Sequence, residues 1–392
     1  MRLFDKCYNF TRHTEVKREG LYPFFLPVSG STDTEVIING KRKIMIGSNN
    51  YLGLTHHPHV VESAKRAIDR YGSGCTGSRF LNGNLDLHLE LEERLARLLG
   101  TEAALVFSTG YQTNLGVIST LVGRQDTVYL DKLNHACIVD GARLSFGTVQ
   151  RFNHGDLDAL EAMLRSQEGG GALVIVDGVF SMEGTLADVP RLAELRQEYD
   201  FALALDDAHS IGVLGTSGAG TAEHFGLTKQ VDLTIGTFSK SFASIGGFVG
   251  GPRPVIDYLQ HHARSLIFSA SMPPSAVAAV LAAMDVMEAE PERRERLWAI
   301  TKRMIEGFRH LGFDTGPTET PIVPVMIGPM EEALLFWREL FERGVYTNAV
   351  LPPAVPEGSC RLRTSYIATH SDDQLDFVLE QFAEVGKKLA VV

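Results

Sequence analysis

Short apolar runs alternate with amphipathic stretches through the middle of this chain. The apolar runs end at polar or glycine residues, which is typical of buried strands. Most of the stretches between them, such as 157–167 and 189–199, have apolar residues three or four positions apart and predict helices. The predicted strands are Ala103–Phe107, Thr127–Leu130, Thr148–Phe152, Ala172–Asp177, Phe201–Leu205, Leu233–Gly236 and Gly247–Gly250.

This alternation predicts an α/β fold in which helices cover both faces of a mostly parallel seven-stranded sheet. The last strand follows its predecessor too closely for a helical crossover, so we expect it to run antiparallel. Three parts are predicted: an N-terminal segment at 1–55, a large α/β domain at 56–285 and a smaller C-terminal α+β domain at 286–392. The N-terminal segment contains a predicted hairpin around Asn39-Gly40, and a long helical stretch is expected at Pro274–Leu311.

Composition and charge narrow the class of protein. The chain has 392 residues, of which 44% are hydrophobic and 22% charged, as in an ordinary soluble globular protein. Its formal net charge of −11 argues against general nucleic-acid binding, which needs a basic face. The four cysteines show no CxxC spacing, so neither a disulfide framework nor a zinc site is expected. Because the chain shows no signal sequence and no apolar run long enough for a membrane span, we expect a cytoplasmic protein.

A lysine preceded by two hydroxyls follows the sixth predicted strand, in Thr234-Ile-Gly-Thr-Phe-Ser-Lys-Ser241. The strand delivers Thr237, Ser239 and Lys240 to its carboxyl end, where open α/β sheets bind ligands. A lysine amine forms a Schiff base with an aldehyde cofactor, and hydroxyls beside it can hold a phosphate. For a lysine taken singly, the alternative is a solvated surface charge.

An acid and a histidine three residues apart follow the fifth predicted strand, in Leu205-Asp-Asp-Ala-His-Ser210. Asp206 ends a continuous apolar run, where a carboxylate is costly to bury unless it is paired. A protonated pyridine nitrogen is such a partner, and His209 could contact the ring or its phenolic oxygen. The alternative for Asp206-Asp207 is a helix N-cap. Taken with Lys240, the motif predicts a pyridoxal phosphate (PLP) site.

Other loops carry candidate chemistry. The segment Ser108–Asn114 fits a strand-to-helix turn whose amides could hold a phosphate, with a helix cap by its first two residues as the alternative. His135 follows another strand, where its ring could stack on a flat cofactor. The segment Gly72–Gly77 matches GxGxxG but follows a helical pattern, so no dinucleotide site is expected there. Arg79 in the same loop is expected to line the entrance of a site.

Metal and hydrolase chemistry are not expected. His56, His57 and His59 lack regular ligand spacing. The sequence contains neither a GxSxG elbow nor an HExxH helix, which removes two common kinds of hydrolase.

Blocks along nearly the whole chain resemble the α-oxoamine synthases, a group of fold-type I PLP-dependent enzymes. The resemblance implies a fold-type I transferase that condenses a small amino acid with an acyl-CoA thioester and releases CO₂ and CoA. It also implies a homodimer with active sites shared between subunits. The matching blocks are Ser48-Asn-Asn-Tyr-Leu-Gly-Leu54, Gly77-Ser-Arg79, Thr109-Gly-Tyr111, Asn134-His-Ala136, Asp177-Gly-Val-Phe-Ser-Met-Glu-Gly184, Asp206-Asp-Ala-His209, Gly236-Thr-Phe-Ser-Lys240, Phe268-Ser-Ala-Ser-Met-Pro-Pro274 and Arg361-Leu-Arg-Thr364.

The same resemblance implies roles around the cofactor ring. Lys240 would carry the cofactor as a Schiff base and, once released, act as the general base at the substrate Cα. Asp206 would pair with the pyridine nitrogen. His209 and Ser181 would contact the region of the phenolic oxygen, and His135 would stack on the ring face.

Roles around the phosphate and the substrate follow from the resemblance as well. Ser271 would reach the phosphate from the second subunit. Arg363 would hold the carboxylate of the amino acid, with Asn50 nearby, and Arg79 is a further predicted substrate-binding residue. The residues expected to surround the phosphate from the same subunit are Gly110, Tyr111, Thr237 and Ser239.

Three blocks look most like the serine palmitoyltransferase branch of this family: Ser239-Lys240, Ser78–His88 and Leu362–His370. This implies L-serine and a long-chain acyl-CoA as substrates and a 3-keto long-chain base as product. The alternatives are the glycine C-acetyltransferase and 8-amino-7-oxononanoate synthase branches, an aminotransferase or decarboxylase on the same fold, and a regulatory or structural paralogue without turnover.

Overall fold

The computed structural model describes residues 2–392, which form two compact units. The larger unit is Asn49–Arg296, and the smaller one combines the residues up to Ser48 with Leu297–Val392. The N-terminal residues join the C-terminal part because β3 (Lys41–Met45) pairs in parallel with β12 (Val345–Tyr346). These divisions fall after residues 48 and 296, whereas the sequence predicts boundaries after 55 and 285.

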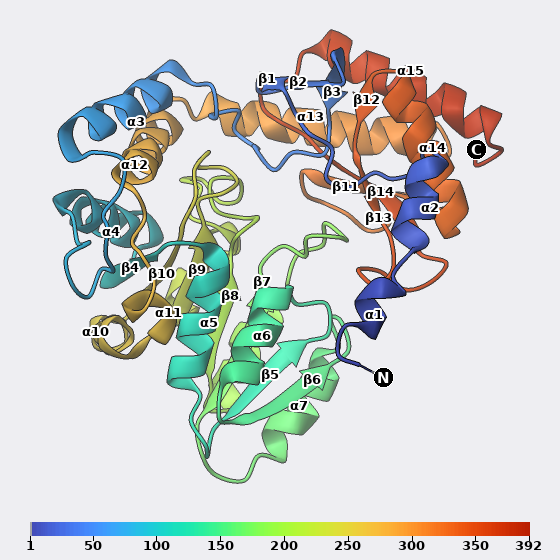
Figure 1. Ribbon diagram of the computed structural model, residues 1–392. Helices are drawn as coiled ribbons and strands as arrows, with labels where there is room; N and C mark the ends of the chain where they lie inside the picture. Colours follow the sequence, from blue (N-terminus) through green and yellow to red (C-terminus); the bar gives the residue numbers. More distant parts are fainter. Residues whose placement is uncertain (1) are drawn as a thin grey trace. The chain divides into compact units, whose positions relative to one another are not determined.

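A seven-stranded sheet forms the centre of the larger unit (Figure 1). Its order is β4-β10-β9-β8-β7-β5-β6, and neighbours are parallel except that β10 runs antiparallel to both β4 and β9. The predicted α/β class and the reversed last strand are confirmed. The strands are β4 (Ala103–Phe107), β5 (Thr127–Asp131), β6 (Thr148–Phe152), β7 (Ala172–Asp177), β8 (Ala202–Asp206), β9 (Leu233–Thr237) and β10 (Gly247–Gly251).

Alternate residues of the strands face opposite layers of helices. In β4, Leu105 and Phe107 join one apolar cluster, while Ala104 and Val106 join another. The first cluster also contains residues of α5, α6, α10 and α11. On the other face of the sheet, one cluster contains residues of α3, α4 and α12, and another contains residues of α7 and α8. Figure 1 shows α5 and α6 side by side along the sheet. Burial on both faces explains why the strands are continuous apolar runs.

The helices predicted at 157–167 and 189–199 are present and end within two residues of the predicted positions. The helices of this unit are α3 (Pro58–Tyr71), α4 (Asp86–Leu99), α5 (Gly110–Leu121), α6 (Ala136–Leu144), α7 (Leu157–Arg165), α8 (Val189–Glu198), α9 (Thr221–His224), α10 (Arg253–His262), α11 (Arg264–Ile267) and α12 (Pro274–Ala289).

The long helical stretch expected at Pro274–Leu311 is two helices. The first, α12, ends at Ala289, and α13 (Glu292–His310) begins directly after Pro291. A proline ring clashes with the preceding helical turn and removes a backbone donor, so it stops one helix but suits the start of the next.

The smaller unit contains a three-stranded antiparallel sheet and a four-stranded mixed sheet. Its core contains Phe308, Phe313, Phe336 and Phe382, whose rings pack mostly edge to face. Its remaining elements are α1 (Asp5–Tyr8), α2 (Arg12–Arg18), β1 (Gly30–Ser31), β2 (Glu35–Ile38), β11 (Ile322–Gly328), α14 (Met330–Glu342), β13 (Asn348–Val350), β14 (Cys360–Ser365) and α15 (Asp372–Lys388).

Within residues 2–392, no helix has both the length and the apolar character needed to cross a membrane.

Candidate active site

A cavity of about 340 Å³ lies in the larger unit where β4, β5, β7, β8 and β9 end. The carboxyl ends of parallel strands share one edge of a sheet, so residues far apart in sequence meet there. The predicted site residues that line this cavity are Gly110, Tyr111, His135, Asp206, His209, Thr237, Ser239 and Lys240.

Lys240 lies in the loop at 238–246, a compact turn that joins β9 to β10. Phe238 N–H donates to the Gly246 carbonyl at 3.0 Å, and Ser244 N–H donates back to the Phe238 carbonyl at 3.0 Å. Phe238 and Phe242, on either side of the lysine, are both fully buried. The apolar anchors therefore fix the turn, and the polar residues between them line the cavity.

The two hydroxyls before Lys240 are arranged on the same turn. Thr237 Oγ1 donates to the Gly246 carbonyl at 2.9 Å and lies 3.0 Å from Ser239 Oγ. Thr237 is buried, whereas Ser239 is exposed. The predicted cluster of hydroxyls beside Lys240 therefore exists, and its outer member is accessible to a ligand.

The first turn of α5 lies against these hydroxyls because residue 110 is glycine. A Cβ at Gly110 would lie 2.8 Å from the Thr237 Cβ, closer than real Cβ contacts allow. Thr109 caps the helix, accepting a hydrogen bond from Gln112 N–H at 3.1 Å, so the cap alternative is correct for this residue. The helix N-terminus still presents backbone donors and a positive dipole end, which suit a phosphate.

Asp206 is 3% exposed at the end of β8. Its Oδ1 accepts from Ala208 N–H at 3.0 Å, and its Oδ2 accepts from Asn114 Nδ2 at 2.7 Å. The helix-cap alternative is wrong here, because the next helix, α9, has Gly220 at its N-cap. Two donors leave a carboxylate with capacity for a further partner.

Asn114 supports Asp206 from α5. It is 1% exposed, and its Nδ2 also lies 3.2 Å from Cys137 Sγ. Within the described chain its Oδ1 is buried without a hydrogen-bond partner. An unsatisfied buried acceptor costs about 1–3 kcal/mol. The amide is therefore held in this orientation by the hydrogen bonds that it donates to Asp206 and Cys137.

His135 is the N-cap residue of α6. Its Nδ1 accepts from Cys137 N–H at 3.2 Å and lies 2.8 Å from Cys137 Sγ, while its own backbone N–H donates to Asp177 Oδ2 at 2.8 Å. Burial raises the pKa of the Cys137 thiol, which keeps its proton. Desolvation by the surrounding chain lowers the pKa of His135, although the residue as a whole is exposed at the surface. These contacts favour a neutral imidazole with its proton on Nε2.

His209 is held by a tyrosine from a distant part of the sequence. The Tyr51 hydroxyl lies 2.7 Å from His209 Nδ1, and both side chains are buried. One ring nitrogen is thus engaged by the protein, and this contact fixes the ring for any partner at the other nitrogen.

Two further buried aspartates surround Asp206. Asp177 is its register partner on β7, and burial together with the Asp206 charge raises the pKa of Asp177 well above its ordinary value. Asp207 is fully buried and accepts from both N–H and Oγ1 of Thr221, the first residue of α9. Burial raises the pKa of Asp207 to about 6. Asp207 therefore ties the end of β8 to the start of α9 across the loop that carries His209.

The other predicted site residues do not line this cavity. Arg79 forms a bidentate pair with Glu92 at 2.8 and 3.0 Å, and its side chain is 6% exposed. Ser271 Oγ donates to the Gly77 carbonyl at 3.1 Å. The remaining three are Ser181, with intermediate exposure; Asn50, which donates to Thr55 Oγ1 at 2.9 Å; and Arg363, buried on β14 of the smaller unit. Their roles stay predictions.

Several residues at the cavity or in contact with its residues were not predicted from the sequence. Asn114 lies four positions after Gly110 and thus on the same face of α5, a spacing that could have identified it. Asp177 is the last residue of a predicted apolar strand, and Asp206 directly follows another. The position that drew attention to Asp206 could therefore have identified Asp177 as well. Tyr51 and Cys137 carry no such signal, because only the tertiary fold brings Tyr51 to His209 and the cap geometry brings Cys137 to the His135 ring.

The residues present fit PLP. A lysine, a buried carboxylate with remaining acceptor capacity and a glycine-opened helix N-terminus beside two hydroxyls line one cavity. They supply the amine, the partner for a ring nitrogen and the phosphate cradle that this cofactor requires. Among residues 2–392 no cluster of three or more histidine, cysteine or acidic side chains is placed to hold a metal ion.

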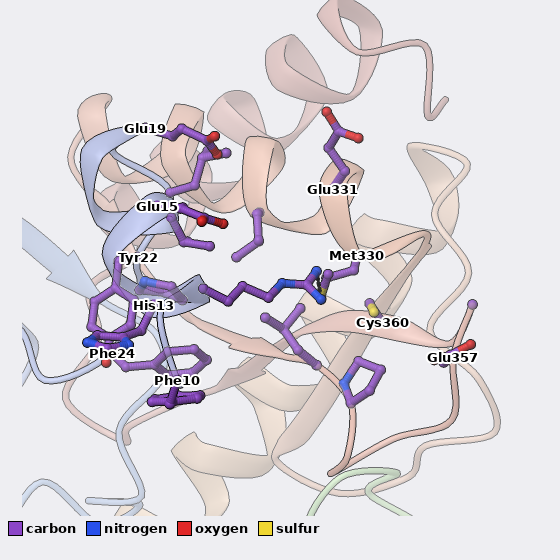
Figure 2. Close-up of a pocket in the computed structure, with 18 residues that line it drawn as sticks. Phe10, His13, Glu15, Glu19, Tyr22, Phe24, Met330, Glu331, Glu357 and Cys360 are labelled. Atoms are coloured by element: carbon purple, nitrogen blue, oxygen red, sulfur yellow. Dashed lines mark hydrogen bonds between the residues drawn. The ribbon is translucent and has the colours of Figure 1, made fainter. Parts of the chain in front are cut away.

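A larger cavity, of about 920 Å³, lies within the smaller unit (Figure 2). Its labelled side chains include Phe10, His13 and Glu15 from the N-terminal residues and Glu331 from α14. None of the predicted site residues lines it. Its size alone therefore does not make it the candidate site.

Comparison with known proteins identifies the family to which the chain belongs. The family model described as aminotransferase class I and II matches residues 41–382. A serine palmitoyltransferase from Sphingobacterium spiritivorum is 49% identical over 391 residues, which are 100% of this chain and 98% of that protein. An 8-amino-7-oxononanoate synthase from Geobacter sulfurreducens is 44% identical over 381 residues, covering 96% of this chain and 97% of that protein.

Among solved structures, one of SPT with its PLP internal aldimine superposes with a TM-score of 0.96. The two chains are 36% identical, and the match covers 100% of each. The predicted fold-type I architecture is confirmed by this agreement over the full length.

Proposed function

This chain belongs to the aminotransferase class I and II family and, within it, to the PLP-dependent α-oxoamine synthases, and on that premise we propose that it condenses L-serine with a long-chain acyl-CoA. The reaction joins the serine Cα to the acyl carbon, releases CoA and CO₂, and leaves a 3-keto long-chain base.

The observation that carries this choice of substrates is the identity of 49% to a serine palmitoyltransferase over the full length. The serine-palmitoyltransferase-like blocks Ser78–His88 and Leu362–His370 point the same way. The identity of 44% to an 8-amino-7-oxononanoate synthase makes that sister activity the second candidate, with alanine and pimeloyl-CoA as its substrates.

When bound, PLP supplies an aldehyde for the substrate amine and a ring that accepts electrons. Lys240 removes the proton from the substrate Cα, because its amine is a base and lines the same cavity as Asp206 and His135. Asp206 holds a proton at the pyridine nitrogen. His209 donates a hydrogen bond towards the phenolic oxygen, and His135 covers one ring face and excludes water there.

The substrate carboxylate is assigned to Arg363. A planar guanidinium can pair with a carboxylate through two parallel hydrogen bonds, which fixes direction as well as position. This assignment, and those of Asn50, Ser181 and Arg79, rest on the motif blocks in which these residues lie.

We further propose a homodimer to which Ser271 contributes across the interface. Ser271 N–H donates to the Gly77 carbonyl at 3.0 Å. This hydrogen bond connects two segments of the chain that carry three large, exposed apolar side chains. Phe80, Leu81 and Phe268 are 54%, 76% and 74% exposed in the single chain. Such a group of exposed apolar side chains is typical of a protein interface. Sedimentation of the holoenzyme measures its oligomeric state. A fully active monomer at assay concentration would contradict the proposed dimer.

Release of free thiol from acyl-CoA tests the substrates. Serine, alanine and glycine are each combined with acetyl-, pimeloyl- and palmitoyl-CoA, with Lys240→Ala as the inactive control. Each methylene removed from water contributes about 0.8 kcal/mol, so we expect catalytic efficiency with serine to rise steeply with chain length.

The outcomes separate the candidates. The largest efficiency with serine and palmitoyl-CoA supports the proposal. A preference for alanine with pimeloyl-CoA, or for glycine with acetyl-CoA, moves the chain to a sister activity. Amino-group transfer without any thiol release would contradict the acyltransferase assignment itself.

A further inference from the structure

A chain of hydrogen bonds connects the two groups that face the ring of the cofactor. Asp206 Oδ2 accepts from Asn114 Nδ2 at 2.7 Å, the same Nδ2 lies 3.2 Å from Cys137 Sγ, and Cys137 Sγ lies 2.8 Å from His135 Nδ1. All four side chains line the same cavity. Neither Asn114 nor Cys137 has a role in the chemistry described so far.

One backbone N–H indicates the directions of the hydrogen bonds in this chain. Cys137 N–H points at His135 Nδ1 at 3.2 Å, so that nitrogen acts as an acceptor and the ring proton lies on Nε2. The thiol proton is then directed to the same nitrogen, and Sγ is left to accept from Asn114. The amide nitrogen lies 2.7 Å from Asp206 Oδ2, 3.2 Å from Cys137 Sγ and 3.5 Å from the Gly110 carbonyl, so its two protons are assigned to the two nearest acceptors. The amide oxygen stays buried without a partner within the described residues.

These contacts affect how charge is distributed around the ring. A doubly protonated His135 would be a cation beside Asp206 and would compete with the ring nitrogen for its charge. A donor on Asp206 stabilises the carboxylate relative to the carboxylic acid, so a shared proton moves towards the ring nitrogen. The other ionisable groups at this cavity are Tyr111, Asp177, His209 and Lys240.

We propose that Asn114 and Cys137 are positioning residues that reserve the Asp206 charge for the pyridine nitrogen, Asn114 by donating to the carboxylate and Cys137 by holding His135 as the neutral Nε2–H tautomer. The proposal rests on the dependence of this chain on PLP and is independent of the choice between serine and another amino acid.

Nitrogen NMR of the holoenzyme tests the histidine half. With ¹⁵N-labelled histidine, the His135 signals are those lost in His135→Gln. In the wild type we expect a protonated Nε2 and an unprotonated Nδ1. Cys137→Ala should shift the population towards the other tautomer or the cation, and Cys137→Ser, which keeps a donor and an acceptor, should restore it. Cys360→Ala removes a buried thiol in the smaller unit and should leave these signals unchanged.

The same method tests the aspartate half when the ring nitrogen of PLP carries the label. In the wild type we expect this nitrogen to be protonated. Asn114→Leu keeps the branched heavy-atom shape of the side chain but removes both donors, and should lower the proton affinity of the ring nitrogen about tenfold, as expected for loss of one hydrogen bond to a charged group. Circular dichroism confirms that the variant is folded, and Asn114→Ser serves where it is not.

Either half can be overturned without any assay of turnover. A wild-type His135 with its proton on Nδ1, or unchanged histidine signals in Cys137→Ala, contradicts the role of Cys137. An unchanged ring-nitrogen signal in folded Asn114→Leu contradicts the role of Asn114. Failure of the thiol-release screen with serine would leave both results standing, because no substrate is present in these spectra.

Discussion

The two cavities of this chain differ in a way that their sizes do not predict. The larger, of about 920 Å³, has walls that include the exposed Arg12 and Glu15 of α2, a helix without a buried residue. The smaller, of about 340 Å³, is lined by Asp177 and Asp206, which are 4% and 3% exposed. Buried charge at strand ends, rather than volume, is therefore the basis on which we propose the smaller cavity as the active site.

The physical basis of the difference is the cost of desolvation. A carboxylate at the surface of the large cavity keeps its water, so its presence needs no explanation. The buried carboxylate of Asp206, at the end of β8, can keep its negative charge only if hydrogen-bond donors replace the lost water. The chain supplies two such donors, Ala208 N–H and Asn114 Nδ2. Variants in the two cavities should therefore differ sharply in effect.

The largest effect is expected for Lys240→Ala in the smaller cavity. Without the amine, the visible absorbance of the Schiff-base cofactor should disappear and turnover should fall by at least about 10²–10⁴-fold, the contribution typical of a lost general base. Absorbance spectra and the thiol-release assay measure both. Lys387→Ala, an exposed lysine on α15, is the control. Full activity of Lys240→Ala would rule out the proposed attachment of the cofactor.

Asp206→Asn should have the next largest effect. The amide cannot supply the charge that keeps the ring nitrogen protonated, so exchange of the substrate Cα proton for deuterium should slow by about 10²–10³-fold while the cofactor remains bound. Asp158→Asn, on the exposed side of α7, should exchange at the wild-type rate. Equal rates in all three proteins would remove Asp206 from the chemistry.

Asp207 should affect stability in a pH-dependent way. Its pKa is raised from 3.8 to about 6 in the folded chain, so it stabilises the fold below pH 3.8, and this contribution is lost as the pH rises through about 6. The difference between these two pKa values corresponds to a contribution of about 3 kcal/mol to the free energy of unfolding.

Urea unfolding of the wild type and Asp207→Asn checks this sign. Between about pH 4.5 and about pH 7, the free energy of unfolding of the wild type should fall relative to the variant by about 2 kcal/mol. A difference that stays constant with pH, or one that grows in favour of the wild type, contradicts the raised pKa.

The smallest effect is expected in the large cavity. Arg12 is exposed on α2, so Arg12→Ala should change the free energy of unfolding by less than about 0.5 kcal/mol and leave the cofactor spectrum unchanged. Loss of turnover in this variant would show that the larger cavity takes part in the reaction and would break the contrast between the two.

The sheet of the larger unit could be predicted from the sequence because its physical signal is local. Buried strands are continuous apolar runs, and Ala103–Phe107 and Ala172–Asp177 have the predicted bounds. The break at Pro291 was missed, because apolar residues continue with helical spacing on both sides of it, although proline itself carries the signal.

The candidate site could be predicted only in part. Lys240 and Asp206 follow recognisable strands, so their meeting at one edge follows from the topology. The supporting contacts depend on side-chain packing between distant segments, as with Tyr51 and His209, which are 158 positions apart. No periodicity encodes such a pair.

Strand β4 has a consequence for synthesis of the chain. It lies at one end of the sheet order, and its neighbour there is β10, so that Phe107 waits for Gly247, 140 residues further along. At about 5–20 residues per second, a ribosome needs about 7–30 s to make that interval. During this time the apolar segment Ala103–Phe107 lacks its partner strand and is exposed to water and to other nascent chains, so we expect it to be a binding site for chaperones until β10 emerges.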